Sequence, residues 1–246
     1  MRRILIVFTL IASAMLLSEC GKSTKTQTKI QGFYIFDHFL GIRQGNTVKF
    51  YHTNNLKTWE YSAGKDFVSP GNIDGVFYYI GNYIGALHNR TVKFYETGKG
   101  GAWKYSPGRD FVSPDHVDGI FHYHDNIIGV WEGKTIRFYQ SFHKGDWHKA
   151  PVKDFVSPGA IDGAFYSANS FIGIRDGRTI KFYGIDDHGN WFYSTGAGKD
   201  FKIPYDVDDV MYNDTEMALL KGKTIKFYEI SSNGTWTYKE GADFSF

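Results

Sequence analysis

Aspartate residues recur near the start of four similar segments of this sequence, and their oxygens could hold a cation. They are Asp74, Asp118, Asp162 and Asp208, and Gln31 stands at the matching place in the first segment. Carboxylate oxygens are ligands that Ca²⁺ prefers, so we expect a site for Ca²⁺ or another cation if the fold brings these side chains together. The alternative is that each aspartate caps a turn, which the glycine that follows in four of the five segments supports.

Two further sets of charged residues occur once per repeat. The cations are Lys49, Lys93, Arg137, Lys181 and Lys226. The carboxylates each precede a phenylalanine and are Asp66, Asp110, Asp154, Asp200 and Asp243. Because a buried charge needs a partner, the equal numbers predict one carboxylate–cation pair per repeat, with a structural role. The alternative is a ring of five cations that faces an anionic ligand.

A tryptophan also occurs once per repeat, and tyrosines lie close to most of them. The tryptophans are Trp59, Trp103, Trp147, Trp191 and Trp236, and the tyrosines are Tyr61, Tyr105, Tyr193 and Tyr238. Aromatic platforms of this kind stack on sugar rings and anchor protein interfaces, so these tryptophans are candidates for ligand stacking. Packing between repeats is the alternative interpretation and the commoner role.

The third repeat differs from the others in its histidines. They are His116, His122, His124, His143 and His148. His122 and His124 alternate and so share one face of a strand. With Asp118 or Asp125 they could bind a transition metal, although histidines on the surface are the simpler interpretation.

One pentapeptide, recurring five times, organises the chain. The copies are Thr47-Val48-Lys49-Phe50-Tyr51, Thr91-Val92-Lys93-Phe94-Tyr95, Thr135-Ile136-Arg137-Phe138-Tyr139, Thr179-Ile180-Lys181-Phe182-Tyr183 and Thr224-Ile225-Lys226-Phe227-Tyr228. Successive copies start 44, 44, 44 and 45 residues apart. A fixed period in this range is typical of a solenoid or a propeller.

Each repeat carries the signals of four short strands. In the second repeat, 75–79 is rich in β-forming residues, Gly81-Asn82 signals a turn, and 83–87 is a second apolar run. The pentapeptide forms the third strand and the tryptophan segment the fourth. Glycine in the turn before the pentapeptide, present in four of five copies, indicates a tight hairpin.

Four antiparallel strands repeated five times predict an all-β, five-bladed β-propeller with a repeat of about 44 residues. The propeller covers 30–246, with blades at about 30–72, 73–116, 117–160, 161–206 and 207–246. Blade starts such as Ile30-Gln31-Gly32 and Ile73-Asp74-Gly75 leave each blade complete within one stretch of chain. An open β-solenoid is the alternative.

The N-terminal segment has the form of an export signal. Arg2 and Arg3 precede the apolar stretch 4–17, which is too short for a typical membrane span. Residues 17–21, Leu-Ser-Glu-Cys-Gly, resemble the lipobox of bacterial lipoproteins, in which the cysteine is lipidated and becomes the mature N-terminus. The resemblance implies lipidation of Cys20 after removal of residues 1–20, with 21–29 as a flexible tether. A plain secretory signal is the alternative, because Glu19 stands where the family prefers a small residue.

The repeats also resemble those of the hemopexin-like family. Residues 219–228 are similar to the hairpin between the second and third strands of that repeat, and the Ile-Asp-Gly-Val-Phe start at Ile73 looks like its Ile-Asp-Ala-Ala-Phe start. The resemblance implies a propeller whose inner strands line an ion-holding channel. This chain has five units where the family has four, and it lacks the cysteine pair joining first and last blades. Five-bladed animal lectins are an analogy of blade count alone.

Composition and motifs favour a binding protein. A net charge of +2 with dispersed charges argues against nucleic acid as a partner. The sequence has no nucleophile elbow, metal-hydrolase motif or nucleotide loop, and its near-uniform repeats lack the distinct carboxylate pair of a glycosidase. The loops between the third and fourth strands, such as 98–101, vary most, and variable loops on a fixed scaffold would carry recognition, although drift explains them equally well.

We therefore expect an exported, membrane-anchored lipoprotein of the cell envelope or cell surface. It is expected to be a monomer whose propeller binds a glycan or an envelope or extracellular protein. Nearly uniform repeats would supply equivalent sites used together. The alternatives are a glycoside-hydrolase-like propeller enzyme and a structural envelope protein without a small ligand.

Overall fold

The computed structural model describes residues 30–246 except 37–38, 56, 99, 143–144, 168–170, 195–199, 214–215 and 233, and the side chains of 34–36. The export signal, Cys20, the tether and His143 therefore lie outside the described residues. Within the described part of the chain every regular element is a β-strand. No helix long and apolar enough to cross a membrane occurs in that part.

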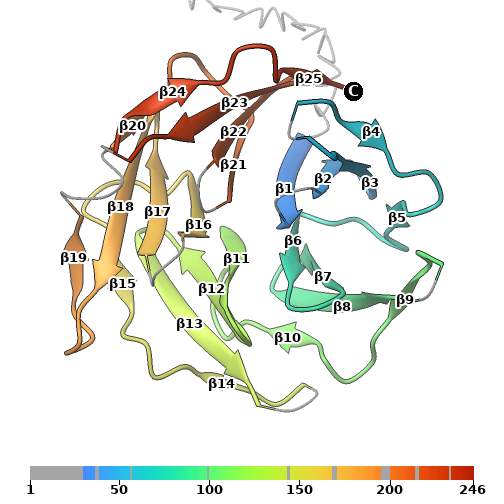
Figure 1. The fold of residues 1–246 in the computed structure, drawn as a ribbon. Helices are drawn as coiled ribbons and strands as arrows, with labels where there is room; N and C mark the ends of the chain where they lie inside the picture. The colour runs from blue at the N-terminus through green and yellow to red at the C-terminus, as the bar shows by residue number, and fades with distance from the viewer. Residues whose placement is uncertain are drawn as a thin grey trace, which may run out of the picture.

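Five antiparallel sheets form a ring (Figure 1). The first blade contains β1 (Ile30–Phe36), β2 (Phe39–Gln44), β3 (Thr47–His52), β4 (Glu60–Tyr61) and β5 (Phe67–Val68). The second contains β6 (Gly75–Tyr79), β7 (Tyr83–His88), β8 (Thr91–Thr97), β9 (Trp103–Tyr105) and β10 (Phe111–Val112). The third contains β11 (Gly119–His124), β12 (Ile127–Glu132), β13 (Thr135–Ser141), β14 (Trp147–Lys149) and β15 (Phe155–Val156). The fourth contains β16 (Gly163–Ser167), β17 (Phe171–Asp176), β18 (Thr179–Ile185), β19 (Trp191–Tyr193) and β20 (Phe201–Lys202). The fifth contains β21 (Asp209–Asn213), β22 (Glu216–Lys221), β23 (Thr224–Ile230), β24 (Trp236–Tyr238) and β25 (Phe244–Ser245).

The predicted all-β, five-bladed propeller with four-stranded antiparallel blades is confirmed. Each blade consists of consecutive strands, with the first near the axis and the tryptophan strand outside (Figure 1). Two short strands share the outermost position. In the first blade, β4 pairs with the end of β3 through Tyr51 and Tyr61, and β5 pairs with its start through Val48 and Phe67.

The strand register corrects the sequence alignment of the first blade by one residue. Phe77 pairs with Gly85 in the second blade, and Phe33 pairs with Gly41 in the first. Gln31 therefore corresponds to Gly75, not to Asp74 as the shared Ile-x-Gly pattern suggested. The position of Asp74 is taken in the first blade by Ile30.

Each blade packs an inner-strand side chain over a small residue of its second strand. Phenylalanine lies over glycine in four blades, in the pairs Phe33 and Gly41, Phe77 and Gly85, Phe121 and Gly129, and Phe165 and Gly173. A Cβ atom on Gly85 would lie 2.4 Å from Cζ of Phe77, so the glycine makes room for the ring. The fifth blade has Met211 opposite Ala218, a smaller ring-free side chain opposite a larger partner.

The hydrophobic core lies between blades. One buried cluster joins Leu40 and Ile42 of the first blade to Ala218, Leu220 and Phe227 of the fifth, across the point where the ring closes. Similar clusters join the other neighbouring blades. Because each sheet has two apolar faces, it reaches a buried state only with a blade on both sides, and this favours the closed ring.

Candidate functional site

The two ends of the propeller carry different kinds of connection. The turns between second and third strands and the segments that link blades lie together at one end, as shown by the hydrogen bond from Ser69 N to Asn46 O at 2.9 Å. We call this end the hairpin face. The opposite end, the loop face, carries the turns between first and second strands and the variable loops between third and fourth strands.

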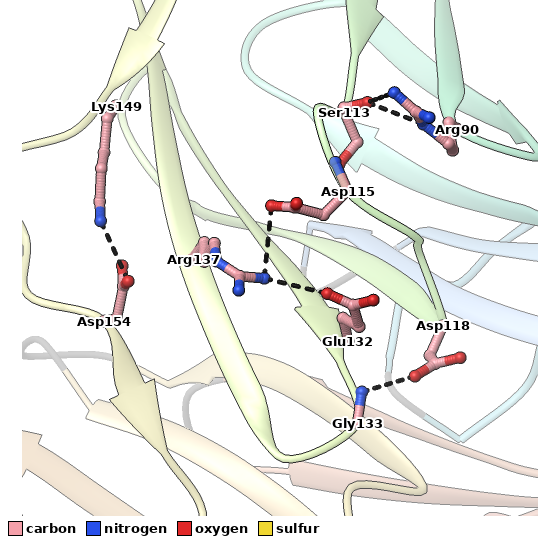
Figure 2. Close-up of polar contacts among 9 residues, drawn as sticks. All are labelled: Arg90, Ser113, Asp115, Asp118, Glu132, Gly133, Arg137, Lys149 and Asp154. Atoms are coloured by element: carbon pink, nitrogen blue, oxygen red, sulfur yellow. Dashed lines mark hydrogen bonds and ion pairs between the residues drawn. The ribbon is translucent and has the colours of Figure 1, made fainter.

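The four repeated aspartates lie at the hairpin face, and each accepts a hydrogen bond from a turn of its own blade. Their Oδ2 atoms accept from Asn89 N at 2.6 Å, Gly133 N at 2.7 Å, Gly177 N at 2.6 Å and Gly222 N at 2.6 Å, for Asp74, Asp118, Asp162 and Asp208 respectively. Figure 2 shows the bond between Asp118 and Gly133. The turn residues have positive φ, 53° at Asn89 and 56° at Gly133, so the carboxylates hold hairpins in a left-handed conformation. This is the geometry of the turn-capping alternative.

Three of these aspartates also line the central channel, whose volume is about 460 Å³. They are Asp74, Asp118 and Asp162. Among the residues that the structure describes, no group of three or more His, Cys, Asp or Glu side chains is arranged to hold a metal ion. A cation in the channel therefore stays a prediction from the sequence.

Arg43 is a buried residue that the sequence analysis missed. Its side chain is 6% exposed and bridges the first and second blades, where Nη1 donates to Asp74 O at 2.9 Å and Nη2 to Ile73 O. Nε donates to Gly45 O at 2.9 Å. Burial lowers the pKa of Arg43, and Asp74 and Asp209 oppose that shift. The guanidinium group thus links the first and second blades. The sequence feature that could have revealed this role is a charged residue at a position that is leucine in the second and fifth blades.

Among the residues that the structure describes, the predicted ion pair between the pentapeptide cation and the carboxylate forms in the fifth blade alone, and the carboxylates of the other blades have different partners. In the fifth blade, Lys226 Nζ lies 3.7 Å from Asp243. In four blades the carboxylate accepts a hydrogen bond from a tyrosine hydroxyl, at 2.7 Å from Tyr61 to Asp66, 2.7 Å from Tyr105 to Asp110, 2.6 Å from Tyr193 to Asp200 and 2.7 Å from Tyr238 to Asp243. The hydroxyl thus supplies the partner that the carboxylate needs. Lys49, Lys93 and Lys226 lie over the rings of the tyrosines in their own blades, at 5.6, 5.8 and 5.4 Å from the centroids.

The third blade replaces that tyrosine with a lysine. Lys149 Nζ lies 3.0 Å from Asp154 (Figure 2). Arg137 turns to other carboxylates, with Nη1 at 3.5 Å from Asp115 and 3.3 Å from Glu132 (Figure 2). These contacts are partly exposed, and they give the predicted cation of this blade a structural partner.

The five tryptophans lie between blades. Each ring stacks on the pentapeptide phenylalanine of the preceding blade, with centroid distances of 5.7 Å for Trp59 on Phe227, 5.5 Å for Trp103 on Phe50, 5.7 Å for Trp147 on Phe94, 5.6 Å for Trp191 on Phe138 and 6.4 Å for Trp236 on Phe182. The packing alternative therefore accounts for all five rings. Trp103 differs from the other four tryptophans, because it also lines a groove at the loop face.

The described histidines of the third blade pair with nearby acidic groups or with backbone. His116 lies 3.2 Å from Asp118, His124 lies 3.3 Å from Asp125, and His148 lies 2.7 Å from Asp146. His122 shares a hydrogen bond of 2.7 Å with Asp125 O, and burial lowers its pKa. These separate pairs agree with the interpretation as surface histidines, except that His122 lines the channel.

The groove that Trp103 lines runs between the first and second blades and has a volume of about 600 Å³. Its aromatic wall consists of Phe39, Phe50, Tyr78 and Trp103. Gly98, Gly100 and Gly101 of the variable loop bring backbone groups to the rim. Lys65 lies over Phe39, with Nζ 5.3 Å from the ring centroid. An aromatic cleft with a few polar groups is the usual form of a small-molecule site.

Asn82 is one of the polar side chains that line this groove. Its Nδ2 donates to Thr97 O at 2.9 Å and to Glu96 at 3.2 Å. Its Oδ1 accepts no hydrogen bond from any residue that the structure describes, whereas Oδ1 of the equivalent Asn126 accepts one from Gln140 at 3.0 Å. Asn82 thus offers an acceptor to a ligand in the groove.

At three of the other four blade boundaries the corresponding place carries different contacts, and at the fourth the loop 195–199 lies outside the described residues. Between the second and third blades, the Arg109 guanidinium lies 4.4 Å from the centroid of Tyr83. There the loops also meet, since a Cβ on Gly145 would lie 1.9 Å from Gly108 O. Between the third and fourth blades, Lys153 Nζ donates to Asn190 at 2.7 Å and to His188 O at 3.1 Å. In the fifth blade, Glu216 replaces the aromatic residue and lies 2.7 Å from Lys239.

Comparison with known proteins describes the fold alone. No family model and no curated protein matches the sequence. Similar solved structures include a protein from Lactobacillus plantarum, with 8% identity and a TM-score of 0.48 over 83% of this chain and 67% of that one. Hsv2 from Kluyveromyces lactis has 13% identity and a TM-score of 0.47 over 89% and 63% of the two chains. Hsv2 from Kluyveromyces marxianus has 8% identity and a TM-score of 0.46 over 89% and 99%.

These similarities carry no information on ligand or partner, because both the identity and the structural overlap are low. The hemopexin-like resemblance of the repeats finds no family match and stays an expectation. What the structure adds is therefore local: one aromatic groove at the loop face and a channel beside it.

Proposed function

We propose that this protein is a glycan-binding module whose ligand site is the groove between the first and second blades. The observation that carries the proposal is the aromatic wall of that groove together with polar groups at its rim. A sugar ring presents C–H faces that pack on aromatic side chains and hydroxyl groups that need hydrogen-bond partners. Trp103 and Phe39 would supply the first, and Asn82, Lys65 and the glycine backbone the second.

The groove favours binding over hydrolysis. Its described lining contains no aspartate or glutamate, whereas glycoside hydrolysis in most enzymes uses two carboxyl groups. The described carboxylates of the channel, such as Asp74 and Asp118, accept hydrogen bonds from hairpin turns at the opposite face. Binding at the groove needs no chemical step, which fits the residues present.

The site should bind one ligand per chain. The sequence suggested equivalent sites in all blades, but Arg109, Lys153 and Glu216 change the corresponding places at three other boundaries, and the loop 195–199 of the remaining boundary lies outside the described residues. Avidity would then require many copies of the protein on one surface, each with one weak site, rather than several sites on one copy. A lipid on Cys20 would provide that surface display.

Export and lipid anchoring are part of the proposal and depend on the sequence. The stretch 4–17 and the lipobox-like segment at Cys20 support a lipoprotein of the cell envelope or cell surface. Expression in a bacterial host with radiolabelled palmitate should label the natural chain and leave Cys20→Ser unlabelled. Equal labelling of both chains, or of neither, would refute lipidation at Cys20.

A glycan array tests the central claim, with the full chain purified in detergent. Saturable binding to one sugar class is the expected result, and calorimetry with that sugar should give about one site per chain. Trp103→Phe should weaken binding by about tenfold. Trp147→Phe is the matched control, because Trp147 stacks between blades in the same way but lies outside the groove.

A blank array would reject glycan binding for the sugars displayed. An equal loss of binding in both tryptophan variants would show that Trp103 acts through packing and would remove the groove from the proposal. Capture of an envelope protein that competes with no sugar would favour the protein-binding alternative.

A further inference from the structure

Tyr78 is the side chain shared by the groove and the central channel. It lines the groove of about 600 Å³ on one side and the channel of about 460 Å³ on the other. It stands near the end of β6, and its hydroxyl donates to Gly81 O in the adjoining turn. Tyr78 therefore lies between the two cavities at the loop face.

The end of the channel at the loop face, which we call the channel mouth, is lined by tyrosine and histidine side chains. Tyr78, His122, Tyr166 and Tyr212 occupy equivalent positions, because each pairs with the second-strand residue before the small residue of its blade. The acidic end of the channel lies at the hairpin face, as the bonds of Asp74 and Asp118 to hairpin turns show. The mouth is thus aromatic and polar, and the aspartates are remote from it.

We infer that groove and channel mouth form one continuous site for a neutral, β-1,4-linked oligosaccharide that crosses Tyr78. This inference rests on the proposed function and specifies its ligand class. One sugar unit would pack on Trp103 in the groove, and the following units would pass over the Tyr78 ring toward His122 and Tyr166. A β-1,4 linkage suits this path, because it gives a nearly straight ribbon with C–H faces on both sides.

The lining supports a neutral ligand. The described residues of the groove include one cation, Lys65, and no carboxylate, and the cation lies over the ring of Phe39. Phenol hydroxyls both donate and accept hydrogen bonds, as sugar hydroxyls do. Polypeptide ligands would instead need an exposed strand edge or a long apolar groove, and this path offers a short aromatic cleft.

Chain length is the variable that tests the inference. Calorimetry on the full chain in detergent would use N-acetylglucosamine and its β-1,4-linked dimer, trimer and tetramer, and in parallel glucose with its β-1,4-linked oligomers. In one of the two series, the trimer should bind at least about tenfold more tightly than the monomer, because added units reach the channel mouth. Equal affinity of monomer and trimer would overturn the inference and leave the proposed function standing.

Two variants locate the added contacts. Tyr166 lies in the fourth blade, two blades away from the groove. Tyr166→Ala should therefore reduce the affinity for the trimer to about that for the monomer and leave monomer binding unchanged. Tyr166 packs on Tyr123, so Tyr212→Phe is the second variant, because it keeps the ring and removes a hydroxyl that accepts a hydrogen bond from Ser167 Oγ at 3.0 Å. It should cost the trimer about threefold or more. A trimer affinity unchanged in both variants would overturn the path through the mouth.

Failure of the two proposals can be told apart. Absence of binding to both sugar series overturns this inference. If the array then identifies another sugar that Trp103→Phe weakens, the groove remains a glycan site with a different ligand class. If the array is also blank, the proposed function fails with it.

Discussion

The backbone amide of Gly32 in the first blade donates a hydrogen bond to Oδ2 of Asp209 in the fifth, with an N to O distance of 2.9 Å. Asp209 occupies a position that is glycine in the three middle blades. Gln31 occupies it in the first blade and accepts from Val76 N of the second at 3.1 Å. Side-chain acceptors thus stand at this position in the two blades next to the closure point, where none of the described strands is exchanged between the first and last blades.

Replacing Asp209 should weaken the closure of the ring. Asp209→Gly restores the residue of the middle blades, removes the acceptor for Gly32 N, and should lower the free energy of unfolding by about 2 kcal/mol, as for a lost hydrogen bond to a charged group. Asp209→Asn keeps an acceptor and should cost less. Urea unfolding measures both. Identical midpoints for Asp209→Gly and the natural chain would contradict a role in closure.

Gly85 and Phe77 should behave as a coupled pair. Gly85→Ala places a Cβ 2.4 Å from the Phe77 ring and should destabilise the protein by about 1–3 kcal/mol through overpacking. The fifth blade combines Met211 with Ala218, so Phe77→Met added to Gly85→Ala should recover part of the loss. A double-mutant cycle from chemical unfolding gives the coupling energy. Additive effects would show that the two residues do not compete for the same space.

Trp59 and Trp147 form a natural comparison of one hydrogen bond. Both rings stack on a phenylalanine at 5.7 Å. Trp147 Nε1 donates to Arg109 O at 2.9 Å, whereas the buried Nε1 of Trp59 has no hydrogen-bond partner among the described residues. Trp147→Phe should therefore cost about 1 kcal/mol more than Trp59→Phe. Thermal and urea unfolding of the two variants would show it, and an equal or larger loss at Trp59 would refute the assignment.

Stability should fall at alkaline pH because buried tyrosines resist ionisation. Burial raises the pKa of Tyr79 and of Tyr123 from 10.0 to about 12. In the unfolded chain they ionise near pH 10, so the stabilisation is fully present below pH 10 and is lost as the pH rises toward 12. Each tyrosine should account for on the order of 2 kcal/mol. Denaturant unfolding from pH 9 to pH 12 measures the decline, and Tyr123→Phe should make it shallower. A decline of the same slope in that variant would exclude Tyr123 as a source.

The repeat pattern predicted the strands and blades because its signals are local. The alternation of Val92 and Phe94 along one strand and the glycine turns are read from neighbouring residues, and the structure places both as expected. The predicted alignment of the first blade was wrong by one residue. It relied on the similarity of Ile30-Gln31-Gly32 to Ile73-Asp74-Gly75, whereas the cross-strand partner of Phe33 determines the true alignment. That partner, Gly41, is fixed by packing and not by the local pattern.

The sites were predicted less well, for a related reason. The sequence predicted that the aspartate before each phenylalanine pairs with the cation of the pentapeptide. In four blades the structure instead gives that aspartate a hydrogen bond from a tyrosine hydroxyl. Arg43 was not singled out, because its carbonyl partners belong to the next blade. The tryptophans looked equivalent, and in the structure Trp103 alone among them lines one of the two described cavities.

The sequence by itself determined that this protein has five blades of antiparallel strands, since a period of 44 or 45 residues and its turns are properties of each repeat alone. Only the tertiary structure decided where a ligand can enter. The groove is lined by residues 38 positions apart in the sequence, such as Lys65 and Trp103, and the bond from Trp103 Nε1 to Lys65 O forms only when neighbouring blades pack. The groove between the first and second blades is therefore a property of the packed ring.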